Sequence, residues 1–215
     1  MTGIAIYVEG GGDHTHQKAE LRKGLDVLLK SQKDTACACR LGWKLVPCGD
    51  RNAAYNAFNN ALQIAPSIIN VLLVDSEEGI PAEMVNDDIG NARTRVAHLT
   101  QRDRWDLTAA DPERIHLMVR CMEAWIVADP DVLARFYGQG FVRNVLPARQ
   151  NLEDEPKPDI YDKLARATRN TQKGEYGKIK HASKLLERID PAKVVQRCPR
   201  FATFTEWLSQ AITGA

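Results

Sequence analysis

The segment Ser67-Ile-Ile-Asn-Val-Leu-Leu-Val-Asp75 is the most continuous apolar run in the chain, and it constrains the fold more than any other feature. Such a run is typical of a parallel β-strand whose sheet is covered by helices on both faces. The chain returns between parallel strands through crossover connections, which are usually helices. The run therefore predicts an α/β protein with a mostly parallel sheet and helices on both faces.

The rest of the N-terminal two thirds agrees with this class, because strand-like and helix-like segments alternate along it. Further strands are predicted over residues 4–9, 43–47 and 114–120, and helices over residues 14–30, 52–64 and 91–102. Residues 76–112 are polar and are predicted to cross over the strand ends. Asp129-Pro130 has the pattern of an N-cap followed by proline at the first helical position, which predicts a helix that ends at Gly138.

The pattern of residue types in the sequence changes after Val145. Three prolines, Pro147, Pro156 and Pro158, bracket an acidic stretch, and no strand-like run follows them. Helices are predicted over residues 159–169, 176–189 and 204–212. We therefore expect an α/β domain over residues 1–145 and a helical, basic C-terminal extension over residues 146–215 that packs on it.

Charge is unevenly distributed although the net charge is only +1. Residues 71–135 carry 7 basic and 13 acidic side chains, whereas residues 157–200 carry 12 basic and 5 acidic ones. The low net charge argues against a protein that coats nucleic acid indiscriminately. An acidic centre beside a basic region fits a metal site next to a phosphate-binding track, and from charge alone a dipolar surface without a ligand fits equally well.

No apolar run approaches the length needed to span a bilayer, and the N-terminus lacks the pattern of a signal peptide. The five cysteines have no spacing that indicates a disulfide framework, which favours a reducing compartment. We expect a cytoplasmic protein without a membrane partner.

Acidic residues follow two of the predicted strands. Glu9 ends the first strand and precedes three glycines, and Asp75 and Glu77 end the most apolar one. In open α/β sheets, ligands bind beyond the carboxyl ends of the strands, and carboxylates crowded there repel one another unless a cation neutralises them. Oxygen ligands of this kind suit Mg²⁺ or Mn²⁺. The alternative is that Asp75 caps the following loop and that Glu77 is solvated.

These motifs resemble the Toprim domain of topoisomerases, primases and overcoming-lysogenisation-defect nucleases, in which one strand ends in Glu-Gly and a later one in an Asp-x-Asp pair. More closely, Tyr7-Val-Glu-Gly10, Leu73-Val-Asp-Ser-Glu77 and the stretch from His116 to Asp129 resemble an uncharacterised bacterial Toprim-like domain-of-unknown-function family. Tyr176-Gly-Lys-Ile-Lys-His181 is a further matching stretch. Members of that family are often encoded beside an ABC-type ATPase in antiviral defence loci.

The resemblance implies a magnesium-dependent site that cleaves phosphodiester bonds, on a Toprim-like fold. Glu9 matches the Toprim glutamate, a general base or metal ligand, and Asp75 and Glu77 match the metal-binding pair; glutamate at position 77, in place of aspartate, leaves the metal geometry open. The expected metal ligands are Glu9, Asp75 and Glu77, the expected catalytic residues are these three with Glu123 and Lys180, and the expected nucleic-acid contacts are Lys178, Lys180, His181, Arg169 and Lys173.

Two of these acids have alternative explanations. Glu123 follows the strand predicted over residues 114–120 and lies near the same sheet edge, but it could instead pair with Arg120 or Arg51. Asp129 is explained as a helix cap.

We expect a metal-dependent nuclease of a bacterial antiviral defence system that acts with an ABC-type, overcoming-lysogenisation-defect-like ATPase, with DNA favoured over RNA as the substrate. Association with copies of itself is compatible with the sequence. Two other functions fit the same residues: a non-catalytic regulatory subunit of the ATPase complex, and a phosphohydrolase of free nucleotides.

Overall fold

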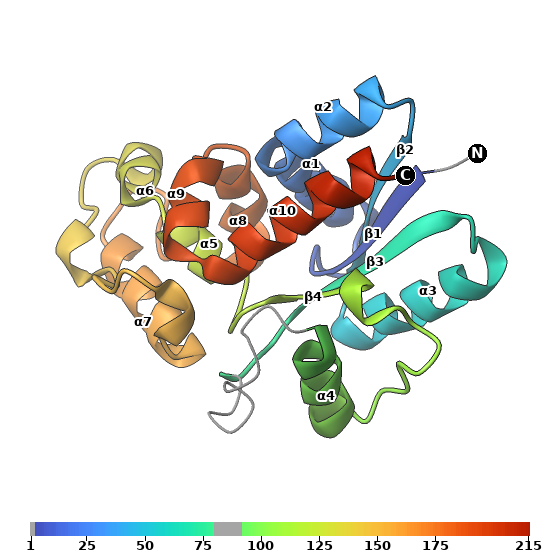
Figure 1. Cartoon of the computed structure of the whole chain (residues 1–215). Coiled ribbons are helices and arrows are strands. Elements are labelled where there is room, and N and C mark those ends of the chain that lie inside the picture. Colours follow the sequence, from blue (N-terminus) through green and yellow to red (C-terminus); the bar gives the residue numbers. More distant parts are fainter. Residues whose placement is uncertain (1–2, 80–91) are drawn as a thin grey trace.

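The computed structural model describes residues 3–79 and 92–215, and its centre is a four-stranded parallel sheet (Figure 1). The strands lie in the order β2-β1-β3-β4. Their bounds are Gly3–Glu9 for β1, Gly42–Gly49 for β2, Ile68–Asp75 for β3 and Ile115–Met118 for β4. Every strand pair in the sheet is parallel, so the predicted α/β class is confirmed.

Each face of the sheet has its own hydrophobic core, because successive side chains of a strand point to opposite faces. In β3, Val71 and Leu73 belong to one core, whereas Leu72 and Val74 belong to the other. The first core is covered by α1 (Thr15–Leu28), α2 (Lys30–Ala38), α8 (Lys178–Leu186) and α10 (Pro199–Thr213), and the second by α3 (Arg51–Ile64) and α4 (Ala92–Asp103) (Figure 1). Helices thus lie on both faces, as predicted.

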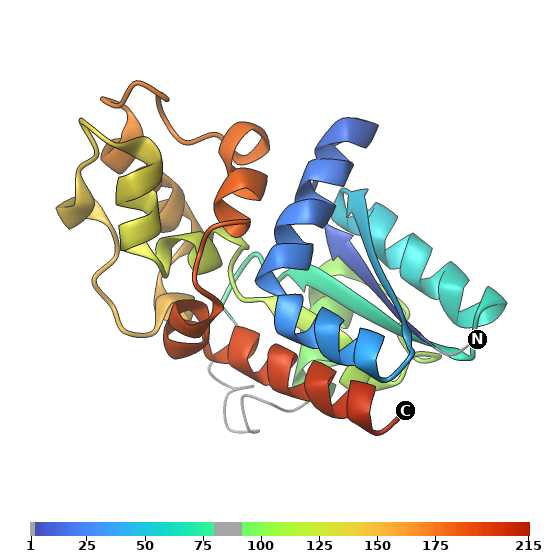
Figure 2. The same cartoon turned by 90° about the horizontal axis from the view of Figure 1, so that it is seen from above.

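The remaining helices form a group beyond the carboxyl end of β4, on the left of Figure 2. They are α5 (Glu123–Val127), α6 (Pro130–Tyr137), α7 (Lys157–Thr168) and α9 (Pro191–Arg197). The hydrophobic core continues from the sheet into this group, since one cluster contains Ile6 of β1, Trp125 of α5 and Phe201 of α10. The segment after residue 145 therefore packs as an extension of the core of the sheet.

Several element bounds differ from the predicted ones. The helix predicted over residues 14–30 ends at Leu28, and the unpredicted α2 follows it directly. β4 is shorter than predicted, because the chain takes a left-handed conformation at Arg120 with φ 63°. The helix predicted over residues 176–189 covers only Lys178–Leu186. The start of the helix predicted over residues 91–102, and much of the predicted crossing over residues 76–112, lie outside the described residues.

In the described ranges, 3–79 and 92–215, none of the helices combines the length and apolar character that crossing a bilayer would require.

The acidic stretch near the start of the predicted C-terminal extension packs against the rest of the protein. Glu153 and Glu155 are both buried. A side-chain oxygen of Glu153 accepts a hydrogen bond of 2.7 Å from the backbone N–H of Arg200, at the start of α10. Burial raises the pKa of Glu153 to about 7 from an ordinary value of 4.5, although hydrogen bonding and the charge of Arg200 oppose this shift. This carboxyl therefore joins the connecting segment to the C-terminal helix.

The raised pKa of Glu153 predicts a pH-dependent stability. The folded protein holds this proton more tightly than the unfolded chain, so the stabilisation is present below pH 4.5 and is lost as the pH rises through 7. The loss corresponds to about 3 kcal/mol in the free energy of unfolding for a shift of this size. We expect Glu153→Gln to remove this part of the pH dependence and to be more stable than the wild type at pH 8.

Urea unfolding at pH 5 and pH 8 measures the effect. Glu20→Gln is the control, because it makes the same change at an exposed carboxyl of α1. An equal pH dependence in the wild type and Glu153→Gln would contradict the prediction.

Candidate metal centre

Three carboxylates converge at the carboxyl end of the sheet. Glu9 is the last residue of β1 and Asp75 the last of the neighbouring strand β3, and Glu77 follows two residues later. One oxygen of each side chain lies within 4.8 Å of the others. Glu9 Oε2 also accepts a hydrogen bond of 3.0 Å from the backbone N–H of Asp75. The structure thus brings together the three residues that were predicted as metal ligands, and we refer to them as the acidic triad.

The glycines after Glu9 allow the chain to turn sharply at this edge. Gly10 has φ 122° and pairs with Gly49 at the end of β2 in a short antiparallel bridge, with N–O distances of 2.7 and 2.9 Å. L-residues rarely adopt such a φ. A Cβ at Gly10 would also lie 3.0 Å from a methyl group of Leu21 in α1. The glycines therefore fix the end of β1, which positions Glu9.

Glu77 has an unusual backbone conformation for a residue with a side chain. Its φ is 67°, in the left-handed region, which costs about 1–3 kcal/mol and persists only where neighbouring contacts hold it. These contacts come from the segment just after β4: the N–H of Glu77 donates to the carbonyl of Arg120 (3.1 Å), and the N–H of Arg120 donates to Ser76 Oγ (2.7 Å). The left-handed turn ends β3 and directs the Glu77 carboxylate back toward Glu9.

Two lysines from the C-terminal segment reach the acidic triad. Lys157 Nζ lies 2.7 Å from Glu77 Oε2 and 3.5 Å from Asp75 Oδ2. Lys178 Nζ lies 3.6 Å from Asp75 Oδ2 and 3.9 Å from Glu123 Oε2. Lys178 was predicted to contact phosphate, whereas Lys157 was missed, because a single lysine after Pro156 at the start of α7 carries no recognisable pattern.

The environment shifts the proton affinities of the triad in opposite directions. Burial, followed by the negative charge of Asp75, raises the pKa of Glu9 to about 7. Burial likewise raises the pKa of Asp75. Burial also acts to raise the pKa of Glu77, but the hydrogen bond and charge of Lys157 outweigh it, so this pKa is lowered. Positive charge is therefore already needed to keep the three carboxylates ionised together.

Glu123 lies next to the triad but does not belong to it. It is fully buried, and its Oε1 accepts a hydrogen bond of 3.0 Å from the hydroxyl of Tyr176. Its Oε2 has no hydrogen-bond partner within residues 3–79 and 92–215, and it lies 3.9 Å from Lys178 Nζ. The alternative pairing with Arg120 or Arg51 is not observed among the contacts of the described residues; the partner is a tyrosine that sequence reasoning did not connect to it.

Asp129 is a helix cap, as predicted. Its Oδ1 accepts a hydrogen bond of 3.2 Å from the N–H of Val132 at the start of α6, and Lys193 Nζ lies 2.7 Å from the same oxygen.

The other predicted phosphate contacts lie apart from the triad. Lys180 Nζ donates a hydrogen bond of 3.0 Å to the carbonyl of Lys173, and Lys173 Nζ lies 5.2 Å from the ring centre of Phe136. Arg169 directly follows α7 as its C-cap and is exposed. His181 is only 2 % exposed, and its Nδ1 accepts a hydrogen bond of 3.1 Å from the N–H of Gly177, so its ring stabilises the start of α8.

The donor set of the triad fits a small divalent cation. Three carboxylate oxygens are the hard ligands that Mg²⁺ and Mn²⁺ prefer. An octahedral ion with bonds of about 2.1 Å holds adjacent ligand oxygens about 3.0 Å apart and opposite ones about 4.2 Å apart, so the triad oxygens, within 4.8 Å of one another, would approach by up to about 2 Å to share one ion. Glu9, Asp75 and Glu77 are therefore the residues that would hold the ion.

Comparison with known proteins gives a family and no closer relative. No curated protein and no solved structure matches the chain. The model of a family described as a domain of unknown function, DUF4276, matches residues 8–209, which agrees with the expected membership of a domain-of-unknown-function family. Because the match covers nearly the whole chain, the protein belongs to the DUF4276 family.

Proposed function

We propose that this protein is a metal-dependent enzyme that hydrolyses phosphodiester bonds in nucleic acid. The observation that supports this most strongly is the acidic triad, in which carboxylates from the ends of two adjacent parallel strands approach within 4.8 Å. Parallel α/β sheets bind their ligands at this edge. The left-handed Glu77 adds to the argument, since strained backbone is concentrated at functional sites.

A divalent ion bound by the triad would activate water and stabilise the leaving oxygen. The residues of the chain supply the remaining requirements. Lys178, between Asp75 and Glu123, places a positive charge where it could contact a phosphate oxygen. Tyr176 fixes Glu123, which in turn faces Lys178. The exposed Lys180, Lys173 and Arg169 are candidates for contacts with a longer polyanion, outside the centre.

The resemblance to Toprim domains supports a nuclease over other phosphoryl-transfer enzymes. The order of the motifs, Glu9-Gly10 and then Asp75-Ser-Glu77, is that of the Toprim pattern, and both motifs end parallel strands. The closer resemblance, to the uncharacterised Toprim-like family, supports an ABC-type ATPase as partner and a role in bacterial antiviral defence. DNA as the substrate and a cytoplasmic location belong to the same proposal.

A second candidate function is a non-catalytic binding subunit. It is favoured by the cations of the site, because Lys157, Lys178 and Arg51 already lie within 4 Å of the triad carboxylates. Such cations can neutralise the carboxylates without any metal. Metal-dependent cleavage separates the two candidates.

The test uses the purified full-length chain, alone and with an ABC-type ATPase encoded beside it. Plasmid DNA, RNA and free nucleotides are each incubated with Mg²⁺ or Mn²⁺, or with a chelator. We expect cleavage of nucleic acid that requires the metal and is lost in Glu9→Gln. Turnover of free nucleotides alone would instead indicate a phosphohydrolase. The nuclease proposal fails if no nucleic acid is cleaved in any combination, or if Glu9→Gln cleaves as well as the wild type.

A further inference from the structure

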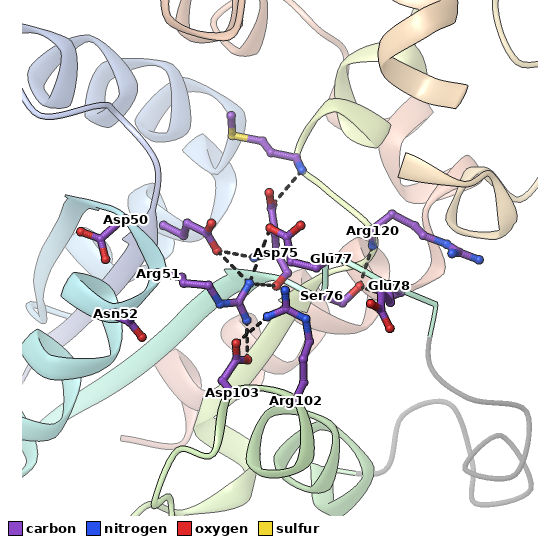
Figure 3. A network of polar contacts seen from close by, with 12 residues as sticks. Asp50, Arg51, Asn52, Asp75, Ser76, Glu77, Glu78, Arg102, Asp103 and Arg120 are labelled. Carbon is purple, nitrogen blue, oxygen red and sulfur yellow. Dashed lines mark hydrogen bonds and ion pairs between the residues drawn. The ribbon is translucent and has the colours of Figure 1, made fainter. Parts of the chain in front are cut away.

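Arg51 contacts all three residues of the acidic triad with one nitrogen. Its Nη1 lies 3.1 Å from the backbone carbonyl oxygen of Asp75, 3.6 Å from Glu77 Oε1 and 3.7 Å from Glu9 Oε2. Arg51 is the first residue of α3, which starts where β2 ends, and so at the same edge of the sheet as the triad. Figure 3 shows its guanidinium directed among the acids.

The other side of the guanidinium is held by residues outside the triad. Arg51 Nη2 lies 2.6 Å from Asp103 Oδ2 at the end of α4 (Figure 3). The guanidinium carbon lies 5.2 Å from the ring centre of Trp105. Trp105 donates in turn from its indole N–H to Asn52 Oδ1, at 3.1 Å. The arginine is therefore fixed between the triad and α4, with both terminal nitrogens engaged by the protein.

We infer that Arg51 is a positioning residue, which holds the carboxylates of Glu9 and Glu77 in their converging arrangement before a metal ion binds, while Asp103 and Trp105 hold Arg51. The inference rests on the proposed metal site. Its physical reason is that buried carboxylates repel one another, and a rigid guanidinium contacts two of them with defined geometry. A role in binding substrate is less suited to Arg51, because Asp75, Glu77, Glu9 and Asp103 already engage its terminal nitrogens.

The sign of the effect on metal affinity distinguishes positioning from simple charge repulsion. A cation within 4 Å of the ligand oxygens repels a metal ion, so removing it would strengthen metal binding if charge alone mattered. If Arg51 positions the carboxylates, removing it weakens binding. Loss of a residue that orients metal ligands typically lowers affinity by a factor of about 10–100.

Calorimetric titration of the full-length protein with Mn²⁺ tests the inference. We expect Arg51→Ala to bind Mn²⁺ about 10–100-fold more weakly than the wild type. Arg51→Lys should not restore the affinity, because one ammonium group cannot contact both Asp103 and the triad. Asp103→Ala should also weaken binding, because it releases Arg51 without changing the triad. Thermal unfolding without metal verifies that each variant is folded.

Two controls match these variants in charge. Arg114→Ala removes a guanidinium just before β4, at the opposite end of the sheet. Asp50→Asn removes an exposed carboxylate from the triad edge that forms no ion pair with Arg51 among the described residues, and asparagine preserves the N-cap of α3. Both should bind Mn²⁺ as the wild type does.

Each outcome is interpretable. Equal or tighter binding by Arg51→Ala, or full affinity in Arg51→Lys, overturns the inference and leaves the metal site standing. If Arg51→Ala does not fold, wild-type affinity in Asp103→Ala overturns it in the same way. Absence of Mn²⁺ binding by the wild type overturns the proposed function, and with it this inference.

Discussion

Replacing Asp75 by asparagine is expected to abolish metal binding and to lower cleavage by about 10³-fold, because a catalytic metal ion stabilises the transition state by several kcal/mol. Asp75 has the most central position in the triad. It is the last residue of β3, and its Oδ2 lies 3.5 Å from Lys157 Nζ and 3.6 Å from Lys178 Nζ. Its backbone N–H donates a hydrogen bond to Glu9. Asparagine preserves the shape of the side chain and removes the charge on which a divalent cation depends.

The fold should survive this substitution. Asp75 Oδ1 accepts a hydrogen bond of 3.0 Å from the N–H of Met122, and an amide oxygen can accept it equally. Because burial raises the pKa of Asp75, its charged form is unfavourable there, so the melting temperature of Asp75→Asn should equal or exceed that of the wild type. Titration with Mn²⁺ measures the metal affinity, a nuclease assay measures the cleavage rate, and thermal unfolding measures the melting temperature.

Asp50→Asn is the matched control for Asp75→Asn, since Asp50 is an exposed carboxylate at the same sheet edge. It should retain both binding and cleavage. Unchanged Mn²⁺ affinity in Asp75→Asn would show that the triad is an ion network, and would favour the non-catalytic binding subunit.

The acids of the site were predictable from the sequence because their position depends on local pattern. Apolar runs mark β1 and β3, and each run ends in an acid. In a parallel sheet the carboxyl ends of neighbouring strands lie at one edge, so Glu9 and Asp75 had to approach each other once these strands were adjacent. The left-handed turn at Glu77 had no such signal, because it depends on hydrogen bonds with Arg120, in the segment just after β4.

The cations of the site were only partly predictable. Arg51 and Lys157 reach the triad through tertiary packing, and an arginine or lysine at the start of a helix is ordinary in sequence. Lys178 and Lys180 were both proposed, but residues two apart on a helix point about 200° from each other, so a single face cannot carry both to the site. The structure directs Lys178 to Asp75 and Lys180 to the carbonyl of Lys173.

Replacing Trp125 by alanine is expected to lower the free energy of unfolding by about 3–5 kcal/mol, the range for large aromatic side chains in a core. Trp125 lies on α5, is 1 % exposed, and packs edge-to-face on Phe201 of α10, with ring centres 4.8 Å apart. This contact joins the segment before residue 145 to the segment after it. Urea unfolding followed by far-UV circular dichroism measures the loss.

Trp207→Ala serves as the control, because Trp207 is a tryptophan of α10 that is only partly buried against the same core. Its loss should be smaller, since less apolar surface returns to water. Both variants should unfold in a single transition, because the core that contains Ile6 also contains Phe201, and removing a contact between the segments then destabilises the whole protein. The opposite result would be two separate unfolding transitions, of which Trp125→Ala shifts only one. It would mean that the helices after residue 145 fold independently of the sheet that carries the acidic triad.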